Sequence, residues 1–292
     1  MKNIMPYLWF DGKAVEAAEF YTQVFENSRI VSVSRYHESS AAVSGQVEGS
    51  VMSVNFELAG LSMVALNGGP IYSFSPAVSF FVHCRSVEEL DAKWQKLVPD
   101  GEILMEPGKY PFSERYGWLR DRFGVSWQLM LSSEDQKIVP CLLFTGKQFG
   151  HASAAIDLYT SAIPASSIQT LERQADGSVL YSAFTLDGQL FTAMESNLDH
   201  GFTFTPAISF LLSCDSEAEL DRVWNKLTAG GVIEQCGWIQ DRFGVSWQIV
   251  PHELFDMIQD KDLVKAERAM QAMLQMQKID LTALRKAYEG EE

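Results

Sequence analysis

The sequence predicts an α+β protein with two tandem domains, each made of two βαβββ modules, followed by C-terminal helices. Two observations support this prediction. The octapeptide DRFGVSWQ occurs at 121–128 and again at 241–248, which identifies an internal duplication. Within each copy, short runs of strand-like alternation surround two stretches of helical periodicity. The predicted boundaries are 1–134 and 135–251 for the two domains and 252–292 for the helical extension.

The duplication extends well beyond the octapeptide. The clearest additional match pairs residues 76–97 with residues 206–227, where a Pro, a Ser-Phe pair, a Cys, a Trp and a Lys-Leu pair recur at the same spacing. The repeat as a whole covers residues 4–131 and 138–250. Two copies that share so many positions are expected to share one fold.

The first module of each copy begins with an apolar strand. In the first copy this strand is 4–10, and Asp11-Gly12 ends it. Residues 13–26 place apolar side chains at helical spacing, which predicts an amphipathic helix. Three strand-like runs follow, separated by polar or Gly turns, at about 29–37, 49–58 and 62–67.

The second module repeats this order. A strand at 76–84 leads into a helix that begins after Ser86 and ends near Val98. Ser86 suits an N-cap, and Glu89 three residues later completes a capping box. Three short strands are predicted near 102–107, 115–120 and 124–131.

The C-terminal extension is predicted to be helical. Residues 252–258 suit a short helix, residues 260–277 carry a Met-rich apolar stripe, and a last helix starts near Asp280. Met side chains fill irregular gaps in a core, so we expect this stripe to pack back on a domain. A flexible groove for a partner is the alternative.

The charge of the chain excludes some classes of function. Lys and Arg number 23 and Asp and Glu number 38, so the net charge is −15. A nucleic-acid surface needs clustered Lys and Arg, so no nucleic-acid partner is predicted. No apolar run reaches the ~20 residues that span a bilayer, so no membrane contact is predicted. An acidic surface suits a cationic ligand, although solvation is the commoner reason for it.

The four cysteines show no C-x-x-C spacing. Cys84 and Cys214 occupy equivalent positions at the ends of the apolar runs SFFVHC and SFLLSC, where a small buried hydrophobe is typical. A reducing, cytoplasmic location is therefore expected. The N-terminal residues MKNIMPYLWFDG do not have the pattern of a signal peptide.

Several segments together resemble the PhnB-like branch of the vicinal oxygen chelate superfamily, to which glyoxalase I and the bleomycin-resistance proteins belong. The segments are PYLWFDGKAVEAAEFYTQVF, SFSPAVSFFVHCRSVEELDAKWQKL, RYGWLRDRFGVSWQLML and MLQMQKIDLTALRKAY. The resemblance implies tandem glyoxalase-like domains, in which two modules form a cup-shaped mixed sheet with helices on its convex side. It also implies a small-molecule ligand in the cup and a dimer-like pairing of the two domains, with a homo-oligomer as an alternative.

Sequences of this branch often carry the name 3-demethylubiquinone-9 3-methyltransferase. A methyl donor such as S-adenosylmethionine usually needs a Gly-rich loop between a strand and a helix. The Gly clusters of this chain, Gly68-Gly69-Pro70 and Gly230-Gly231, are turns that precede strands. The residues therefore do not support a methyltransferase activity, and no cofactor is predicted.

Metal-dependent members of the superfamily hold His or Glu ligands at fixed strand positions. The corresponding positions of this chain hold no His and almost no carboxylate, and the five histidines show no H-x-x-x-H spacing. Neutral Gln and Ser are poor ligands for a divalent transition metal, so no metal site is predicted. A metal-dependent lyase, isomerase or dioxygenase with unusual ligands is the alternative. The corresponding residues are Pro6 or Tyr7, Asn67, Ser79 and Gln128 in the first copy, and Pro140 or Cys141, Glu195, Ser209 and Gln248 in the second.

Alternation along the last strand separates structural residues from ligand-facing ones. Ser126 and Gln128 share one face, and Trp127 lies on the other. By the resemblance the Gln face is the cup interior, so Trp127 is expected in the core. A Gln side chain either offers a donor and an acceptor to a polar ligand or only satisfies backbone groups. On the preceding strand Trp118 and Arg120 share a face, and Arg120 is either at the rim of the cup or a surface charge.

The two copies differ most just before their last strands. The spacing between equivalent residues falls from 130 to 120 because residues 102–116, EILMEPGKYPFSERY, shrink to VIEQ and Cys236. Long loops in compact domains are often lids or binding loops. We therefore expect an open, lidded pocket in the first copy and a mainly structural second copy. The predicted ligand-binding residues are Tyr7, Ser79, Lys109, Tyr110, Phe112, Arg115, Trp118, Arg120, Ser126, Gln128 and Gln248.

The sequence thus predicts a metal-free, small-molecule-binding protein of the glyoxalase fold, and whether it is an enzyme stays open. A metal-dependent enzyme of the same superfamily is one alternative. A drug-sequestering protein of the bleomycin-resistance type is another, because an acidic protein suits a cationic drug. Nucleophilic catalysis has no support, since the sequence pairs no Ser or Cys with a convincing base.

Overall fold

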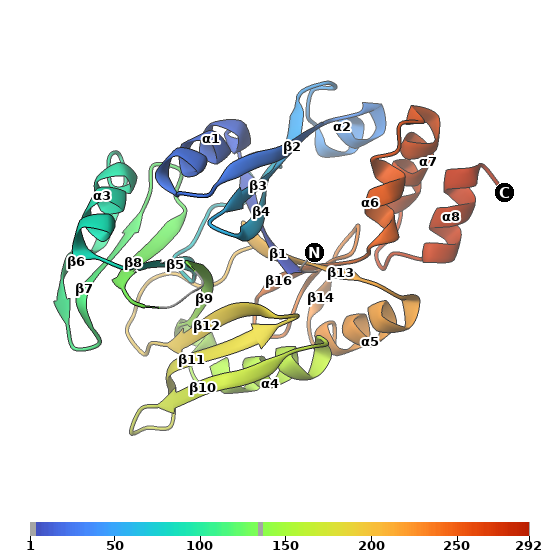
Figure 1. Cartoon of the computed structure of the whole chain (residues 1–292). Helices are drawn as coiled ribbons and strands as arrows, with labels where there is room; N and C mark the ends of the chain where they lie inside the picture. The colour runs from blue at the N-terminus through green and yellow to red at the C-terminus, as the bar shows by residue number, and fades with distance from the viewer. Residues whose placement is uncertain (1–3, 134–136, 292) are drawn as a thin grey trace.

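The computed structural model of the chain describes residues 4–133 and 137–291 (Figure 1). It confirms the α+β class, the four successive modules and the C-terminal helices. None of the helices in the described part of the chain is long and apolar enough to cross a membrane.

The first half of the sequence contributes two modules. The first consists of β1 (Ile4–Phe10), α1 (Ala14–Val24), β2 (Arg29–Arg35), α2 (Glu38–Ser44), β3 (Val51–Leu58) and β4 (Leu61–Asn67). The second consists of β5 (Val78–Cys84), α3 (Val87–Leu97), β6 (Glu102–Tyr110), β7 (Ser113–Arg120) and β8 (Ser126–Leu131). Helix α2 was not predicted, since the sequence indicated only a connection between two strands at this position.

The second half repeats this arrangement with a shorter last hairpin. Its first module consists of β9 (Ile138–Phe144), the short helix η1 (Gly146–Gln148), α4 (Ala152–Ala162), β10 (Ser167–Arg173), β11 (Val179–Leu186) and β12 (Gln189–Glu195). Its second module consists of β13 (Ile208–Cys214), α5 (Glu217–Leu227), β14 (Val232–Ile233), β15 (Trp238–Gln240) and β16 (Ser246–Pro251). The extension consists of α6 (Glu253–Ile258), α7 (Leu263–Leu274) and α8 (Leu281–Glu289).

The strands form two eight-stranded mixed sheets, and each sheet takes one module from each half of the sequence. Sheet A has the order β14-β15-β16-β13-β1-β4-β3-β2, and sheet B has the order β10-β11-β12-β9-β5-β8-β7-β6. The halves are joined by antiparallel pairing of β1 with β13 and of β5 with β9. The sequence predicts that both modules of one half share a sheet. In the structure each sheet instead combines modules of different halves. This is possible because the first strand of every module has a free edge of the same kind, and it forms hydrogen bonds with the first strand of a module from the other half.

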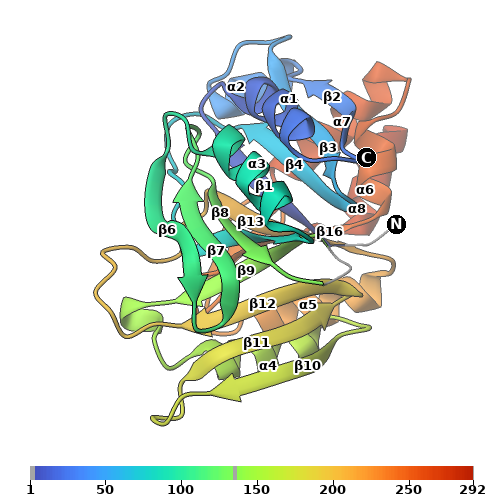
Figure 2. The ribbon, with the colours of Figure 1, turned by 60° about the vertical axis from the view of Figure 1, so that its left-hand side comes forward.

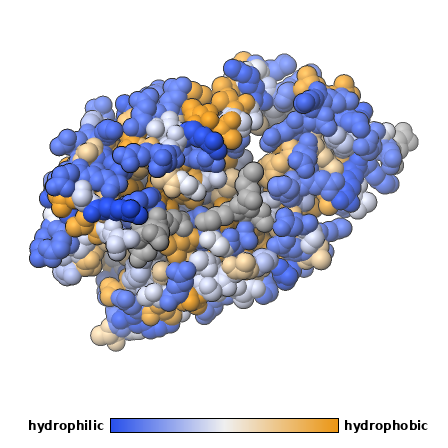
Figure 3. All heavy atoms as spheres, in the orientation of Figure 1, coloured by the Kyte–Doolittle hydropathy of each residue, from blue (hydrophilic) through white to orange (hydrophobic). Residues whose placement is uncertain are grey.

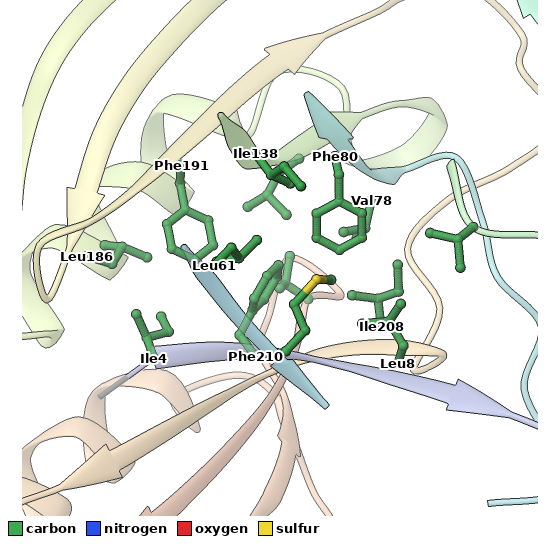
Figure 4. Close-up of a cluster of buried hydrophobic side chains, with 14 of the residues drawn as sticks. Ile4, Leu8, Leu61, Val78, Phe80, Ile138, Leu186, Phe191, Ile208 and Phe210 are labelled. Carbon is green, nitrogen blue, oxygen red and sulfur yellow. The ribbon is translucent and has the colours of Figure 1, made fainter. Parts of the chain in front are cut away.

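The two sheets pack against each other through a common apolar core. Figure 4 shows side chains of sheet A, among them Leu8 and Phe210, close to side chains of sheet B such as Phe80 and Phe191. The rings of Phe191 and Phe210 lie 5.1 Å apart between centroids, with planes near perpendicular. Helices α1, α3, α4 and α5 add their apolar residues to this core. The opposite face of each sheet points outward.

The octapeptide DRFGVSWQ connects each sheet to a helix that packs on the other sheet. The buried Asp121 carboxylate accepts hydrogen bonds from Tyr21 Oη at 2.7 Å and Trp127 Nε1 at 2.8 Å, and from the N–H groups of Phe123 and Val125. Tyr21 belongs to α1, which packs on β3 and β4 of sheet A. The second copy repeats all four bonds at Asp241, with Tyr159 as the helix residue. The prediction that Trp127 is a core residue is confirmed.

The C-terminal helices cover the outer face of sheet A. Leu211 of β13 and Val250 of β16 form one buried cluster with Leu254 of α6 and Leu284 of α8. Met273 and Met276 pack against the same cluster, so the Met-rich stripe packs on the protein as expected. In Figure 1 the three helices lie side by side at one end of the molecule.

Figure 3 shows that the surface in this orientation is mostly hydrophilic, with separate smaller hydrophobic areas.

Candidate functional site

The outer face of sheet B, which we name cup B, holds most of the predicted site residues. The helices that pack on sheet B, α3 and α4, contribute their apolar residues to the inner core. The hairpin β6–β7 forms one edge of the sheet, and β10–β12 lie at the other end (Figure 2). By strand alternation and register, cup B is lined by Ser79, Phe81 and His83 of β5, Tyr116 and Trp118 of β7, Ser126, Gln128 and Met130 of β8, Val139, Cys141 and Leu143 of β9, and Leu190, Thr192 and Met194 of β12.

A chain of side-chain hydrogen bonds crosses the centre of cup B. Tyr116 Oη donates to Gln128 Oε1 at 2.5 Å, and Gln128 Nε2 donates to Ser79 Oγ at 2.7 Å. Trp118 Nε1 donates to Ser126 Oγ at 2.8 Å. Gln128 is only 1% exposed. Its amide therefore bonds to side chains of the cup, and not to the backbone of the sheet.

All three cationic residues among the predicted site residues are paired with carboxylates. Arg115 donates from Nε and Nη2 to Asp91 Oδ1 of α3, at 3.0 and 2.7 Å, so it lies on the α3 side of the hairpin and not in cup B. Lys109 pairs with Glu114 at 2.8 Å on the exposed hairpin. Arg120 pairs with Glu102 at the edge of the sheet, where both side chains are partly exposed. Only Arg120 shares the face of Trp118.

The tip of the hairpin brings aromatic rings to the edge of cup B. The ring of Tyr116 lies 5.4 Å from Tyr110 and 5.0 Å from Phe112, both in edge-to-face geometry. Tyr110 Oη donates to the carbonyl of Glu106. Phe112 is 61% exposed, while Tyr116 beneath it is buried. At 102–116, where the sequence predicts a ligand-facing loop, the structure has a hairpin with several register shifts and an aromatic tip.

His83 is a further residue of cup B that is not among the predicted site residues. This residue is 3% exposed, its ring lies 6.1 Å from that of Phe81 in a stacked arrangement, and its Nδ1 has no hydrogen-bond partner in the described part of the chain. Burial lowers the pKa of His83 to about 4, so the imidazole is neutral near pH 7. Alternation in SFFVHC puts His83 on the face of Ser79, and that signal could have identified it.

Tyr7 and Gln248 lie on the outer face of sheet A, which we name cup A. Gln248 Nε2 donates to Ser209 Oγ at 3.0 Å, as Gln128 does to Ser79 in cup B. Tyr7 pairs in register with Ser209 and packs against the cluster of the C-terminal helices. Burial raises the pKa of Tyr7 to about 12. The predicted site residues are therefore divided between two outer faces.

The residues at the metal-ligand positions of the superfamily do not fit a metal ion. In cup B these positions hold Ser79, Gln128 and the buried thiol of Cys141, whose pKa burial raises to about 11. Asn67 Oδ1 accepts from the N–H of Ala14 at the start of α1, and Glu195 Oε1 accepts from the N–H of Ala152 at the start of α4. In the described residues no three His, Cys, Asp or Glu side chains are grouped as a metal site.

Two mixed sheets of paired βαβββ modules, each with an outward-facing cup, define a protein of the glyoxalase fold. Glyoxalase I from Zea mays aligns over 84% of this chain and 92% of its own, with a TM-score of 0.56 and 11% identity. A mutant of that enzyme aligns over 86% of this chain and 95% of its own, with a TM-score of 0.57 and 12% identity. At such low identity the likeness establishes the fold alone.

The chain belongs to the 3-demethylubiquinone-9 3-methyltransferase family, as the PhnB-like resemblance of its sequence predicted. The family model matches residues 2–130 and again 136–250. The PhnB protein from Bacillus cereus is 44% identical over 44% of this chain and 98% of its own, with a TM-score of 0.40. No curated protein matches the chain.

Proposed function

We propose that the protein binds a small, largely uncharged organic molecule in cup B without a metal ion. The observation that carries this proposal is that different elements cover the two equivalent faces. The C-terminal helices pack on cup A, whereas cup B is bordered by the hairpin β6–β7. Ligand sites are usually apolar concave surfaces with a few placed polar groups, and cup B has that composition.

The short hairpin of the second half explains how the extension reaches cup A. The N–H groups of Cys236 and Gly237 donate to the carbonyls of Met276 and Gln277, both at 2.7 Å. Lys278 pairs with Asp221 of α5, the repeat equivalent of Asp91, with which Arg115 of the long hairpin pairs in the first half. The segment between α7 and α8 thus occupies the place that the hairpin occupies in cup B.

The chemistry of cup B favours a flat ligand with hydrogen-bonding groups. Phe81, Tyr116 and Trp118 supply apolar ring surface, and the three cationic residues near the hairpin are neutralised by partners. The Nδ1 atom of His83 is a buried polar atom with no partner among the described residues, and a ligand hydroxyl or amide would satisfy it. These features support a neutral aromatic compound over a strongly charged one.

A thermal-shift screen of neutral aromatic compounds that carry a hydroxyl or an amide tests the proposal, with native mass spectrometry of the freshly purified protein to detect a ligand that co-purifies. For a compound that raises the Tm of the wild type, Gln128→Glu should abolish the shift, because it places a carboxylate in the apolar cup. Gln248→Glu makes the same change in cup A and should keep the shift.

Two further measurements complete the test. Tyr116→Phe removes a single hydroxyl and should weaken binding by about tenfold, the value of one or two hydrogen bonds; it decides the matter if Gln128→Glu does not fold. Dialysis against EDTA should leave the shift unchanged. Equal loss in both Gln variants, or stoichiometric Zn, Mn, Ni or Fe in protein purified without chelators, would contradict the proposal.

A further inference from the structure

Three aromatic rings meet at the end of β1 beside cup A. The ring of Trp9 lies 5.0 Å from that of Tyr72, at 70° between planes, and 6.0 Å from that of Trp238, at 85°. All three side chains are partly exposed. Because Trp9 stands nearly perpendicular to both neighbours, the rings form adjoining walls and not a stack. We name this group the aromatic corner.

The position of Trp9 is fixed by the turn after β4. Trp9 Nε1 donates to the carbonyl of Gly69 at 2.8 Å. A Cβ atom on Gly68 would lie 2.1 Å from the indole ring, so only Gly allows the backbone to approach this closely. The sequence predicts an ordinary turn at Gly68-Gly69-Pro70. The structure adds that this turn holds one wall of the aromatic corner in place.

A carboxylate without a cationic partner lies next to the aromatic corner. Glu234 is partly buried, and its carboxylate makes no hydrogen bond or ion pair with the described residues. Burial raises the pKa of Glu234. The N–H of Glu234 donates to the carbonyl of Trp238 at 2.9 Å, which places Glu234 opposite Trp238 on the hairpin. Burial, and secondarily the charge of Glu234, raise the pKa of Tyr72. An acid that is partly removed from water and has no partner is unusual, and a bound cation would stabilise its charged form.

The corresponding corner of cup B has a different composition. By the repeat, Trp9 corresponds to Leu143, Tyr72 to Phe202 and Trp238 to Trp118. In chain order, Glu234 follows Ile233 as Leu104 follows Ile103, although a bulge at Leu104 puts Met105 opposite Trp118. Leu104, Leu143 and Phe202 all pack in the apolar cluster of cup B. Thus cup A has a Trp and a Glu at positions where the apolar cluster of cup B has two leucines.

We infer that the aromatic corner and Glu234 form a binding site for a small organic cation of the alkylated ammonium class. The negative faces of aromatic rings attract such cations, Trp most strongly, and an adjacent carboxylate supplies the opposite charge. A single carboxylate is too few oxygen ligands for a divalent metal ion, whereas it suffices for a quaternary ammonium group. This site is separate from cup B and lies on the sheet that the C-terminal helices cover.

Titration calorimetry with choline tests the inference, because 3,3-dimethyl-1-butanol has the same shape without the charge. Choline should bind saturably, and the neutral isostere should bind at least about tenfold more weakly, as expected for a partly desolvated cation–π site. Trp9→Leu and Glu234→Gln should each weaken choline binding by about tenfold. Glu172→Gln makes the same charge change on exposed β10 of the other sheet and should have no effect.

Each other result overturns the inference. Equal affinity for choline and its isostere would identify an ordinary apolar surface. Unchanged choline binding in Glu234→Gln would show that the charge of the chain as a whole, and not this carboxylate, attracts the cation. Absence of saturable choline binding would show that the aromatic corner and Glu234 do not bind this class of cation. If Trp9→Leu lowers the Tm, Glu234→Gln alone decides, since it changes one partly exposed oxygen to nitrogen.

Discussion

Asp121 illustrates how one buried side chain supports two sheets at once. Its Oδ1 accepts from two backbone N–H groups, and its Oδ2 accepts from Tyr21 and Trp127. Burial raises the pKa of the carboxyl, and the four donors oppose that shift. A carboxylate fits this position because both of its oxygens meet donors only.

Asp121→Asn should therefore destabilise the protein strongly. The amide places an NH₂ group against one pair of donors, and bonds to a charged acceptor contribute about 1.5–3 kcal/mol each. We expect a loss of about 3 kcal/mol in the free energy of unfolding, measured by urea denaturation. Asp241→Asn should behave alike. Asp256→Asn, on the exposed side of α6, is the control, and an equal effect of all three would refute the role assigned to Asp121.

His83 makes stability depend on pH in a defined window. Its pKa is about 4 in the folded protein and about 6.5 in an unfolded chain, so the unfolded chain binds the proton first. The neutral imidazole of His83 therefore contributes to the free energy of unfolding above about pH 6.5, and this contribution is lost as pH falls toward 4. The total is about 3 kcal/mol. The wild type should lose more stability than His83→Gln between pH 7 and pH 4.5. Parallel denaturation midpoints across that range would rule this out.

Alternation along a strand predicts which face a residue takes, but not what meets it there. It placed Trp127 in the core and Gln128 on the outer face, as the structure has them. It could not show that Gln128 bonds to Tyr116 and Ser79, because those partners come from other strands. Arg115 was grouped with the ligand-facing residues by its place in a loop. In the structure Arg115 belongs to strand β7. Side chains of a strand alternate between its two faces, so Arg115 points toward α3 while Tyr116 points into cup B.

The two unequal hairpins are the elements that distinguish cup A from cup B. The ten residues missing from the second copy locate this difference in the sequence, but from the sequence we predicted only a lid over the first copy. The structure adds that the shortened hairpin β14–β15 leaves backbone donors at Cys236 and Gly237 for the C-terminal segment. Helix α2 was missed for a related reason. Its short, Ser-rich sequence has weak helical propensity, and packing by α7, with Ser39 N–H bonded to Glu267, stabilises it.

The C-terminal helices should unfold as a unit when their contact with sheet A is weakened. Leu284 of α8 is fully buried in that contact, and Leu→Ala changes at such sites cost about 2–5 kcal/mol. Leu284→Ala should speed amide hydrogen exchange in α7 and α8 and leave the strands of sheet B protected. Leu263→Ala, at an exposed site of α7, is the control. Uniformly faster exchange over the whole chain would mean that the helices are not a separate unit.

At the scale of the whole molecule, the sequence identifies four modules but not which of them pair. Every module begins with a strand of the same length and apolar character, and such strands can pair within a half or between halves. The decision depends on the connection between modules and on the shared core. The pairing of β1 with β13 and of β5 with β9 makes the two halves of the sequence mutually dependent, as two subunits of a dimer would be.

Cutting the chain between Ser133 and Lys137 tests this dependence. Each fragment alone lacks half of both sheets and exposes the apolar faces that meet around Phe80 and Phe210. Co-expressed fragments should therefore purify as a one-to-one complex with the circular dichroism spectrum of the intact chain. A fragment of residues 1–133 expressed alone should aggregate or form a homodimer, since its free β1 and β5 edges have no partner. A stable, folded monomer of either fragment would show instead that each half closes its own sheet, as the repeat in the sequence first suggested.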